Sequence, residues 1–222
     1  MDDTYLIDPR HIWNEYFAIS HEQGVRDNYE PWLNRWSHIL DTTTGLPILD
    51  LGCGSGYDSQ YLTEKGFCVV AGDFSREGLH VAHETANQAE LVELDIRKGI
   101  PFSIGAFQVI IANLSLHYFR WDETQTIVDA IRGRLKMCGY LLARVSSTND
   151  IQYGVTSGEI VERNCRICDD MLKRFFDRDD LERLFRDGWI IQGLEEQVVH
   201  CYSREKVLWE IVVQKAQSST CQ

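Results

Sequence analysis

The sequence has 222 residues, 44% of them hydrophobic, which suits one α/β domain with a sizeable core and is too short for two full domains. Its formal net charge is −12, from 34 acidic and 22 basic side chains. This balance argues against a long nucleic acid as partner, because clustered Lys and Arg normally neutralise a phosphate backbone. No apolar run approaches the roughly 20 residues that a membrane span needs, and the scattered cysteines are typical of reduced thiols in a cytoplasmic protein.

Residues 1–45 carry two predicted helices with aromatic faces. One contains Trp13, Tyr16 and Phe17, and the other contains Trp32. Neither belongs to the strand–helix alternation that follows, so we interpret this segment as a helical lid or cap. The alternative is that both helices simply cover core.

From residue 46 onward, short apolar runs alternate with amphipathic segments. Such repeated strand–helix units predict a parallel sheet with helices on both faces. The last two strands leave no room for a helix between them and therefore form a hairpin. The expected strands are 46–51, 67–71, 89–94, 107–112, 140–145, 189–194 and 207–213. The expected helices are 57–65, 75–86 with Ser75 as N-cap, one opening at Asp122, and one capped by Asp177 and ended by Gly188.

The stretch 146–174 separates a strand from its next helix by far more than the usual connection of about 2–6 residues. We interpret it as an insertion on the substrate side of the sheet, although it too could simply cover core. Within it, Cys165 and Cys168 have the spacing of metal ligands. A structural zinc site needs four ligands, and His200 with Cys201 makes a poor second half, so no metal site is predicted.

The glycine-rich run 48–57, Ile-Leu-Asp-Leu-Gly-Cys-Gly-Ser-Gly-Tyr, ends a strand and opens a helix. Glycines there allow a tight turn and close approach of a ligand, and the helix N-terminus offers unpaired N–H groups. A dinucleotide-binding turn reads G-x-G-x-x-G. Here the third glycine, Gly56, comes one residue early, which weakens the hypothesis of an NAD-dependent oxidoreductase. Asp73 and Asp95 end the next two strands, where a carboxylate normally binds ribose hydroxyls.

The run 49–56 resembles motif I of class I S-adenosylmethionine-dependent methyltransferases, D-x-G-x-G-x-G, and the similarity extends over residues 45–215. The strand 107–110, the loop 114–119 and the segment 139–141 also match. The resemblance implies a single methyltransferase domain over 1–222 with a Rossmann-like α/β fold. Its seven-stranded sheet would be mostly parallel, with an antiparallel last strand inserted between strands five and six. The implied cofactor is S-adenosylmethionine, with S-adenosylhomocysteine as product.

The same resemblance implies positions for the cofactor. The turn 52–56 would face its methionine part, and Asp73 its ribose hydroxyls. Asp95 and Ile96 would lie at the adenine, and 113–114 at the reactive end. The expected cofactor-binding residues are Asp50, Gly52, Cys53, Gly54, Gly56, Tyr57, Asp73, Phe74, Asp95, Ile96, Asn113 and Leu114.

Residues that meet the acceptor are expected at the carboxyl ends of the parallel strands, where ligands of open α/β sheets lie. His117 and His200 are candidate general bases for an acceptor that must lose a proton, although a structural role for either is the alternative. The first aromatic helix is hypothesised to close over the site, because aromatic faces suit a sulfonium. The expected substrate-binding residues are Trp13, Tyr16, Phe17, Tyr118, Arg144 and Asn149.

The loop 116–119 and the stretch 144–150 look most like the small-molecule branch of the superfamily, which includes the tellurite-resistance and thiopurine methyltransferases. The predicted function is in-line transfer of a methyl group to a small-molecule acceptor, with neither a long nucleic acid nor a membrane as partner. Two alternatives stay open. One is a catalytically inactive methyltransferase-like binding or regulatory protein, and the other is the NAD-dependent oxidoreductase.

Overall fold

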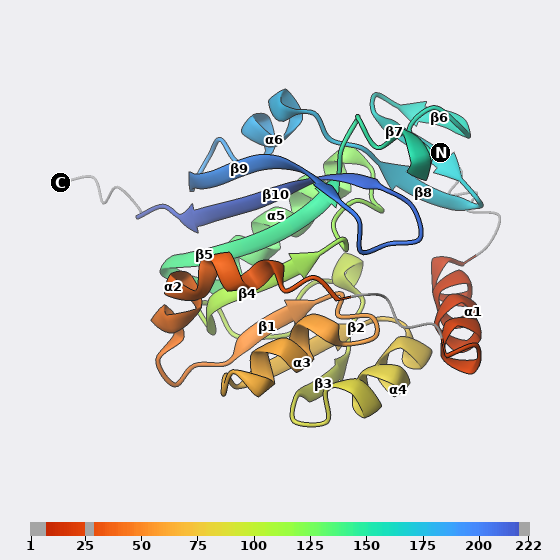
Figure 1. The fold of residues 1–222 in the computed structure, drawn as a ribbon. Helices are drawn as coiled ribbons and strands as arrows, with labels where there is room; N and C mark the ends of the chain where they lie inside the picture. The colour runs from red at the N-terminus through yellow and green to blue at the C-terminus, as the bar shows by residue number, and fades with distance from the viewer. Residues whose placement is uncertain (1–7, 25–28, 218–222) are drawn as a thin grey trace.

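The computed structural model describes residues 8–24 and 29–217. The first seven residues of the expected N-terminal cap, and residues 25–28 within it, lie outside the described residues. The described chain forms one seven-stranded sheet with helices on both faces and a separate three-stranded sheet (Figure 1). No helix within these ranges is long and apolar enough to cross a membrane.

The main sheet has the strand order β3-β2-β1-β4-β5-β10-β9. Its strands are β1 (Ile48–Leu51), β2 (Val69–Asp73), β3 (Glu90–Glu93), β4 (Phe107–Asn113), β5 (Leu135–Ser146), β9 (Trp189–Val199) and β10 (Lys206–Lys215). Strands β1 to β5 pair in parallel, and β10 runs antiparallel to both β5 and β9. The expected Rossmann-like sheet, with its antiparallel last strand inserted beside the fifth, is confirmed.

Successive residues of the central strands point to opposite faces of the sheet, as the period of two requires. Ile110 packs in one hydrophobic cluster and its neighbour Ile111 in the other. Figure 1 shows α3 in front of the sheet and α5 behind it. The helices that follow the strands are α3 (Tyr57–Glu64), α4 (Arg76–Thr85), η3 (Ile96–Lys98), α5 (Trp121–Arg134) and α6 (Arg178–Leu184). The expected N-caps are confirmed, because Ser75 accepts a hydrogen bond from Gly78 N and Asp177 from Asp180 N.

Two strands, β5 and β9, are longer than the sequence predicted, by five or more residues. β5 begins at Leu135 and not at residue 140, because the chain passes straight from α5 into the sheet through Cys138, whose φ is 59°. β9 continues past residue 194 to Val199. β9 is an edge strand with one exposed face, so it can contain polar residues such as Glu196. The apolar pattern in the sequence ends before these residues, and the predicted strand therefore ended too early.

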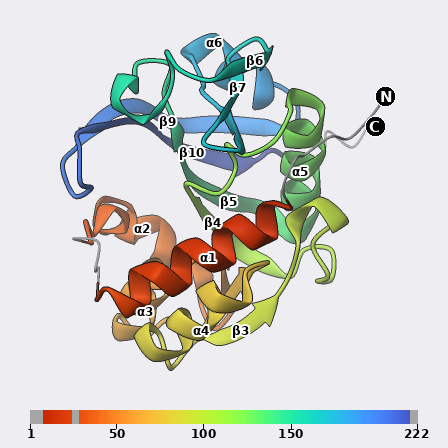
Figure 2. The same cartoon turned by 90° about the vertical axis from the view of Figure 1, so that its right-hand side faces the viewer.

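The N-terminal segment consists of α1 (Pro9–Glu22), η1 (Trp32–Trp36), α2 (Ser37–Leu40) and η2 (Asp41–Thr43). Figure 2 shows α1 crossing in front of the carboxyl ends of the strands. The second expected helix is instead a series of short turns. Hydroxyl groups of Thr42 and Thr43 bond the carbonyls of Ile39 and Leu40 and compete with a continued helical ladder. The short turns nevertheless bury Trp32 within the core.

Residues 147–174 form η4 (Ile151–Tyr153) and an antiparallel sheet of β6 (Glu159–Glu162), β7 (Cys165–Cys168) and β8 (Met171–Arg174). The turn between β7 and β8 places Asp169 and Asp170 at φ 49° and 61°, which gives the twist of a tight hairpin. Figure 1 shows this small sheet on the same side of the molecule as α1, at the carboxyl ends of the main strands. Among the described residues, no group of three or more His, Cys, Asp or Glu could hold a metal ion.

Candidate functional site

The glycine-rich turn between β1 and α3 depends on backbone conformations that L side chains rarely adopt. Gly52, Gly54 and Gly56 have φ of 78°, 50° and 81°. A Cβ on Gly56 would lie 3.0 Å from the Cβ of Ala82 in α4. Gly52 N also donates to Gly72 O over 2.7 Å, which ties the turn to β2. The sequence therefore fixes the backbone of the turn and leaves three of its five positions without a side chain.

Asp73 at the end of β2 is hydrogen-bonded to this turn. Its Oδ2 accepts from Gly54 N over 2.9 Å, and its Oδ1 accepts from Ser75 N over 2.8 Å. Burial raises the pKa of Asp73 in spite of these two hydrogen bonds. Each carboxylate oxygen keeps a further acceptor position that a ribose hydroxyl could use.

Two further carboxylates lie beneath the turn. Asp50 is the penultimate residue of β1 and accepts from Ser59 Oγ over 2.6 Å, and Asp58 lies in the first turn of α3. Burial, and then the negative charges of Asp58 and Asp73, raise the pKa of Asp50 to about 8. Burial also raises the pKa of Asp58. A cation beside this pair would allow both carboxyl groups to ionise, so the place favours a positively charged ligand.

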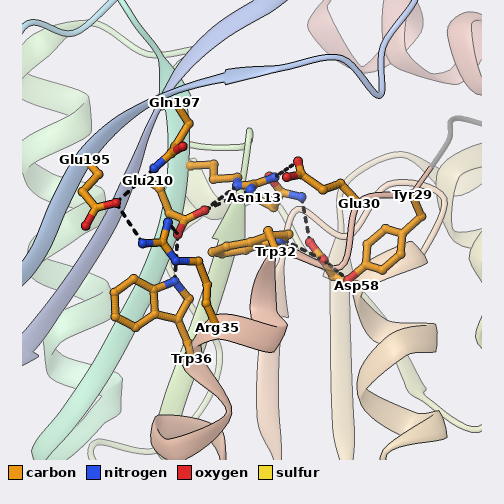
Figure 3. Close-up of polar contacts among 11 residues, drawn as sticks. Tyr29, Glu30, Trp32, Arg35, Trp36, Asp58, Asn113, Glu195, Gln197 and Glu210 are labelled. Atoms are coloured by element: carbon orange, nitrogen blue, oxygen red, sulfur yellow. Dashed lines mark hydrogen bonds and ion pairs between the residues drawn. The ribbon is translucent and has the colours of Figure 1, made fainter.

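Asp58 fixes the orientation of Asn113, the last residue of β4 (Figure 3). Its Oδ1 accepts from Tyr29 Oη and Trp32 Nε1, both over 2.9 Å, and its Oδ2 accepts from Asn113 Nδ2 over 2.8 Å. Because the amide nitrogen faces the carboxylate, Asn113 Oδ1 faces away from it, buried and without a hydrogen-bond partner among the described residues. A buried acceptor without a partner costs about 1–3 kcal/mol, so this atom calls for a donor on a ligand.

Arg144 was expected to bind the acceptor. In the structure its guanidinium forms ion pairs with two glutamates of the chain. Its Nη2 donates to Glu210 over 2.9 Å, its Nη1 donates to Glu30 over 3.2 Å, and its Cζ lies 4.6 Å from the centre of the Trp32 ring. Trp36 Nε1 donates to the other oxygen of Glu210 over 2.9 Å (Figure 3). Arg144 therefore joins the segment 29–36 to the main sheet.

The aromatic face of α1 covers the glycine-rich turn. Phe17 lies against Gly54 and Gly78, since a Cβ on either glycine would come within 3.0 Å of its ring. The ring of Trp13 lies 5.6 Å from that of Phe17 and 5.2 Å from that of Tyr118, centre to centre. These three expected residues meet at the carboxyl ends of β1 and β4. The ring of Tyr16 packs against those of Trp13 and Phe17, with centres 5.5 and 5.3 Å away, and Tyr16 is 49% exposed.

The expected adenine end is more open. Asp95 pairs with Arg97 over 2.8 Å, and this pairing lowers the pKa of Asp95 although burial acts in the opposite direction. The guanidinium groups of Arg10 and Arg97 lie 6.0 and 5.7 Å from the centre of the Phe74 ring. An open cavity of about 520 Å³ adjoins Asp95 and these arginines, and Ile96 begins η3 beside it.

The remaining cofactor positions line the turn and the loop after β4. Cys53 follows the first glycine, and burial raises the pKa of its thiol. Tyr57 begins α3, and its ring stacks on that of Tyr29 with centres 6.4 Å apart. Leu114 has φ 55° and donates its N–H to Arg144 O over 2.9 Å, which turns the chain sharply after Asn113.

The two candidate bases lie in different surroundings. His117 is 1% exposed, its ring centre lies 4.3 Å from that of Tyr118, and its Nδ1 is buried without a partner among the described residues. Burial, and then the charges of Lys206 and Lys173, hold its pKa well below the usual range. The side chain of His200 is 74% exposed and lies 3.9 Å from Glu205 in the turn before β10, away from the buried groups.

Asn149 also lies at the rim, where its Nδ2 donates to Glu196 Oε1 over 2.9 Å. The structure thus brings the turn, Asp73 and Asn113 together, and leaves His200 and Asn149 outside. Sequence reasoning missed Asp58 because an Asp in the first turn of a helix is ordinary there. Its partners Tyr29 and Trp32 come from a distant segment, so no local pattern connects them with it.

The central part of the chain is similar to known methyltransferase sequences. Residues 48–139 match a family described as a methyltransferase domain. A probable 18S rRNA (guanine-N(7))-methyltransferase of Dictyostelium discoideum is 34% identical over 83 residues, which cover 37% of this chain and 28% of that protein. The chain spans about a quarter to a half of the length of the curated relatives it first matches.

Solved structures share the whole architecture. A SAM-dependent methyltransferase from Methanosarcina mazei has a TM-score of 0.67 at 20% identity, over 77% of this chain and 92% of that one. The 1,6-didemethyltoxoflavin-N1-methyltransferase of Burkholderia thailandensis, solved with its substrate and S-adenosylhomocysteine, has a TM-score of 0.65 at 19% identity, over 98% of this chain and 94% of that one. The fold is shared with these S-adenosylmethionine-dependent methyltransferases, and residues 48–139 match the methyltransferase-domain family.

Proposed function

We propose that this chain transfers a methyl group from S-adenosylmethionine to a small-molecule acceptor. The observation that carries the proposal is the buried, unpartnered Oδ1 of Asn113 above the raised-pKa carboxyl groups of Asp50 and Asp58. An ammonium group there would supply the missing donor and the positive charge together, and the methionine part of the cofactor carries one. The residues present therefore fit this cofactor.

In this assignment each part of the site has one task. The glycines of the turn allow the cofactor to approach the backbone closely, and Asp73 accepts from its ribose hydroxyls. Phe17 and Trp13 on α1 act as a lid that excludes water from the sulfonium. The cofactor supplies the methyl group and the thioether leaving group. The acceptor atom contributes the electron pair of the new bond. Its N–H or O–H group, where it carries one, donates a hydrogen bond to Nδ1 of His117, whose low pKa keeps the ring neutral, and the proton is released to water after the transfer.

The segments that border the acceptor lie outside the family match, so that match does not decide the kind of acceptor. The match ends at Gly139, so the insertion 147–174 and the β9–β10 turn, which border the acceptor side, lie outside it. An RNA acceptor is the second candidate, because several curated relatives are rRNA methyltransferases. These relatives match only part of this chain. The net charge of −12 favours the small molecule.

The test is calorimetry with S-adenosylhomocysteine, with 5′-methylthioadenosine, which lacks the amino acid part, and with NAD. We expect Asn113→Ala to weaken S-adenosylhomocysteine binding about tenfold, the equivalent of one hydrogen bond to a charged group, and to leave 5′-methylthioadenosine unaffected. Gln108→Ala, at the opposite end of β4, is the matched control. Binding of NAD without S-adenosylhomocysteine, or equal losses for the two nucleosides, would overturn the proposal.

A further inference from the structure

A second group of buried and half-buried polar side chains lies beside the proposed reaction site. The loop after β4, the end of β5, β8 and the start of β10 contribute His117, Ser146, Lys173 and Lys206 to it. Lys206 Nζ donates to Asp150 Oδ2 over 3.0 Å and to Ser146 Oγ over 3.3 Å. The side chains of Lys206 and Asp150 are 6% and 0% exposed, so this ion pair is shielded from water.

Among the buried and half-buried side chains of this group, positive charge exceeds negative charge. Lys173 and Lys206 face the single buried carboxylate of Asp150, and Asp169 acts on Lys173 from the exposed turn after β7. Burial and the neighbouring charge of Lys206 lower the pKa of Lys173 to about 8, and burial lowers that of Lys206. An additional anion would compensate the excess charge.

Lys173 is only partly satisfied by the chain. Its Nζ donates to the carbonyl of Tyr153 over 2.7 Å, and its other close neighbours are the faces of the Tyr153 and Phe175 rings at 5.4 and 5.2 Å. An ammonium has three donors, and the described residues supply one acceptor for it. The remaining donors are free for a ligand.

His117 supplies an independent sign of a ligand. Within the described ranges, the only two buried side-chain nitrogen or oxygen atoms without a partner are Asn113 Oδ1 and His117 Nδ1. Both lie on the segment that leaves β4. One faces the proposed cofactor. The other belongs to a ring that packs on Tyr118 and whose pKa is lowered by the charges of Lys206 and Lys173, and the carbonyl of His117 accepts from Arg174 N, next to Lys173 in β8, over 2.8 Å. A neutral imidazole nitrogen accepts a hydrogen bond, so His117 calls for a donor at this place.

We propose that the methyl acceptor is a small anionic molecule, whose carboxylate or phosphate group pairs with Lys173 and Lys206 while an N–H or O–H group donates to His117 Nδ1. This inference rests on the proposed methyl transfer and adds the chemical class of the acceptor. A phosphate on an RNA backbone is disfavoured, because Lys206 and His117 lie too deep for a duplex to reach them.

Binding of simple anions to the full chain tests this class. Acetate, benzoate and inorganic phosphate are titrated by calorimetry, with benzamide as the neutral match of benzoate, in the presence and absence of S-adenosylhomocysteine. At least one anion should bind saturably and shift the imidazole nitrogen resonances of His117, whereas benzamide should not. Preference for benzamide, or no anion binding, would overturn the inference. Failure of S-adenosylhomocysteine to bind would instead count against the proposed function.

Lysine variants test whether the anion binds at this group of side chains. Lys173→Met should weaken the binding of that anion at least tenfold, and Lys136→Met, at the exposed opposite end of β5, should leave it unchanged. Because the pKa of Lys173 is about 8, the affinity should fall about tenfold from pH 7 to pH 9 in the unmodified chain and stay level in Lys173→Met. Equal affinities for the two variants, or tighter binding of an RNA hairpin than of every simple anion, would refute the assignment.

Discussion

At the scale of single residues, the buried carboxyl groups under the glycine-rich turn couple proton binding to folding. The pKa of Asp50 is raised from 3.8 to about 8 by burial and by the charges of Asp58 and Asp73. The folded chain therefore holds a proton that the unfolded chain has lost between these pH values. The free energy of unfolding should fall as the pH rises from about 4 to about 8, since the folded state then binds more protons.

A bound cofactor ammonium should reverse this effect by stabilising the ionised pair. We expect S-adenosylhomocysteine binding to release protons at pH 7, measured by calorimetry in buffers of different ionisation enthalpy. Asp50→Asn should abolish most of the release, and the exposed Asp187→Asn should not change it. Proton uptake, or equal release in both variants, would contradict the placement of the ammonium beside Asp50.

At the scale of elements, the N-terminal segment divides into two parts with different energetics. α1 buries one side chain, Phe17, whereas the turns of 32–43 bury Trp32 and Leu33 in the main core. Removal of residues 1–24 should therefore preserve cooperative unfolding and cost about 1–3 kcal/mol, while Leu33→Ala should cost about 2–5 kcal/mol. Denaturant titration measures both.

The same truncation tests the proposed lid. Without Phe17 over Gly54, S-adenosylhomocysteine should dissociate about tenfold faster in stopped-flow measurements, because the turn is open to water. Leu33→Ala provides the comparison, as it lies in the core beneath the sheet and should leave the dissociation rate nearly unchanged. A truncated chain that releases the ligand at the original rate would assign α1 a purely structural role.

The elements also show what an amino-acid pattern can predict. Buried parallel strands such as β4 are continuous apolar runs, so their positions and the sheet built from them followed from the sequence. The strands β6 to β8 did not, because they are short, partly exposed and held by pairs such as Arg174 with Glu162. Likewise, the turn and Asp73 follow a local spacing, whereas Asp58 gains its role from partners distant in the sequence.

At the scale of the whole molecule, the charge distribution separates the two classes of acceptor. The excess of 34 acidic over 22 basic side chains repels a polyanion. Many exposed arginines are also held in ion pairs, as in Arg35–Glu195, Arg76–Glu93 and Arg163–Asp177. Phosphate contacts would have to break these pairs, so the surface offers little of the counterion release that drives RNA binding.

We therefore expect a fluorescently labelled hairpin of 18S rRNA to show no saturable binding below about 10 µM protein in about 100 mM KCl, measured by anisotropy. S-adenosylhomocysteine should bind under the same conditions, which controls for the folded state. A dissociation constant below about 1 µM that weakens steeply with salt would favour the RNA acceptor of the curated relatives. In that case the buried lysines would not select the acceptor, because a phosphate backbone would have to be held at the surface while only a flipped base entered the site.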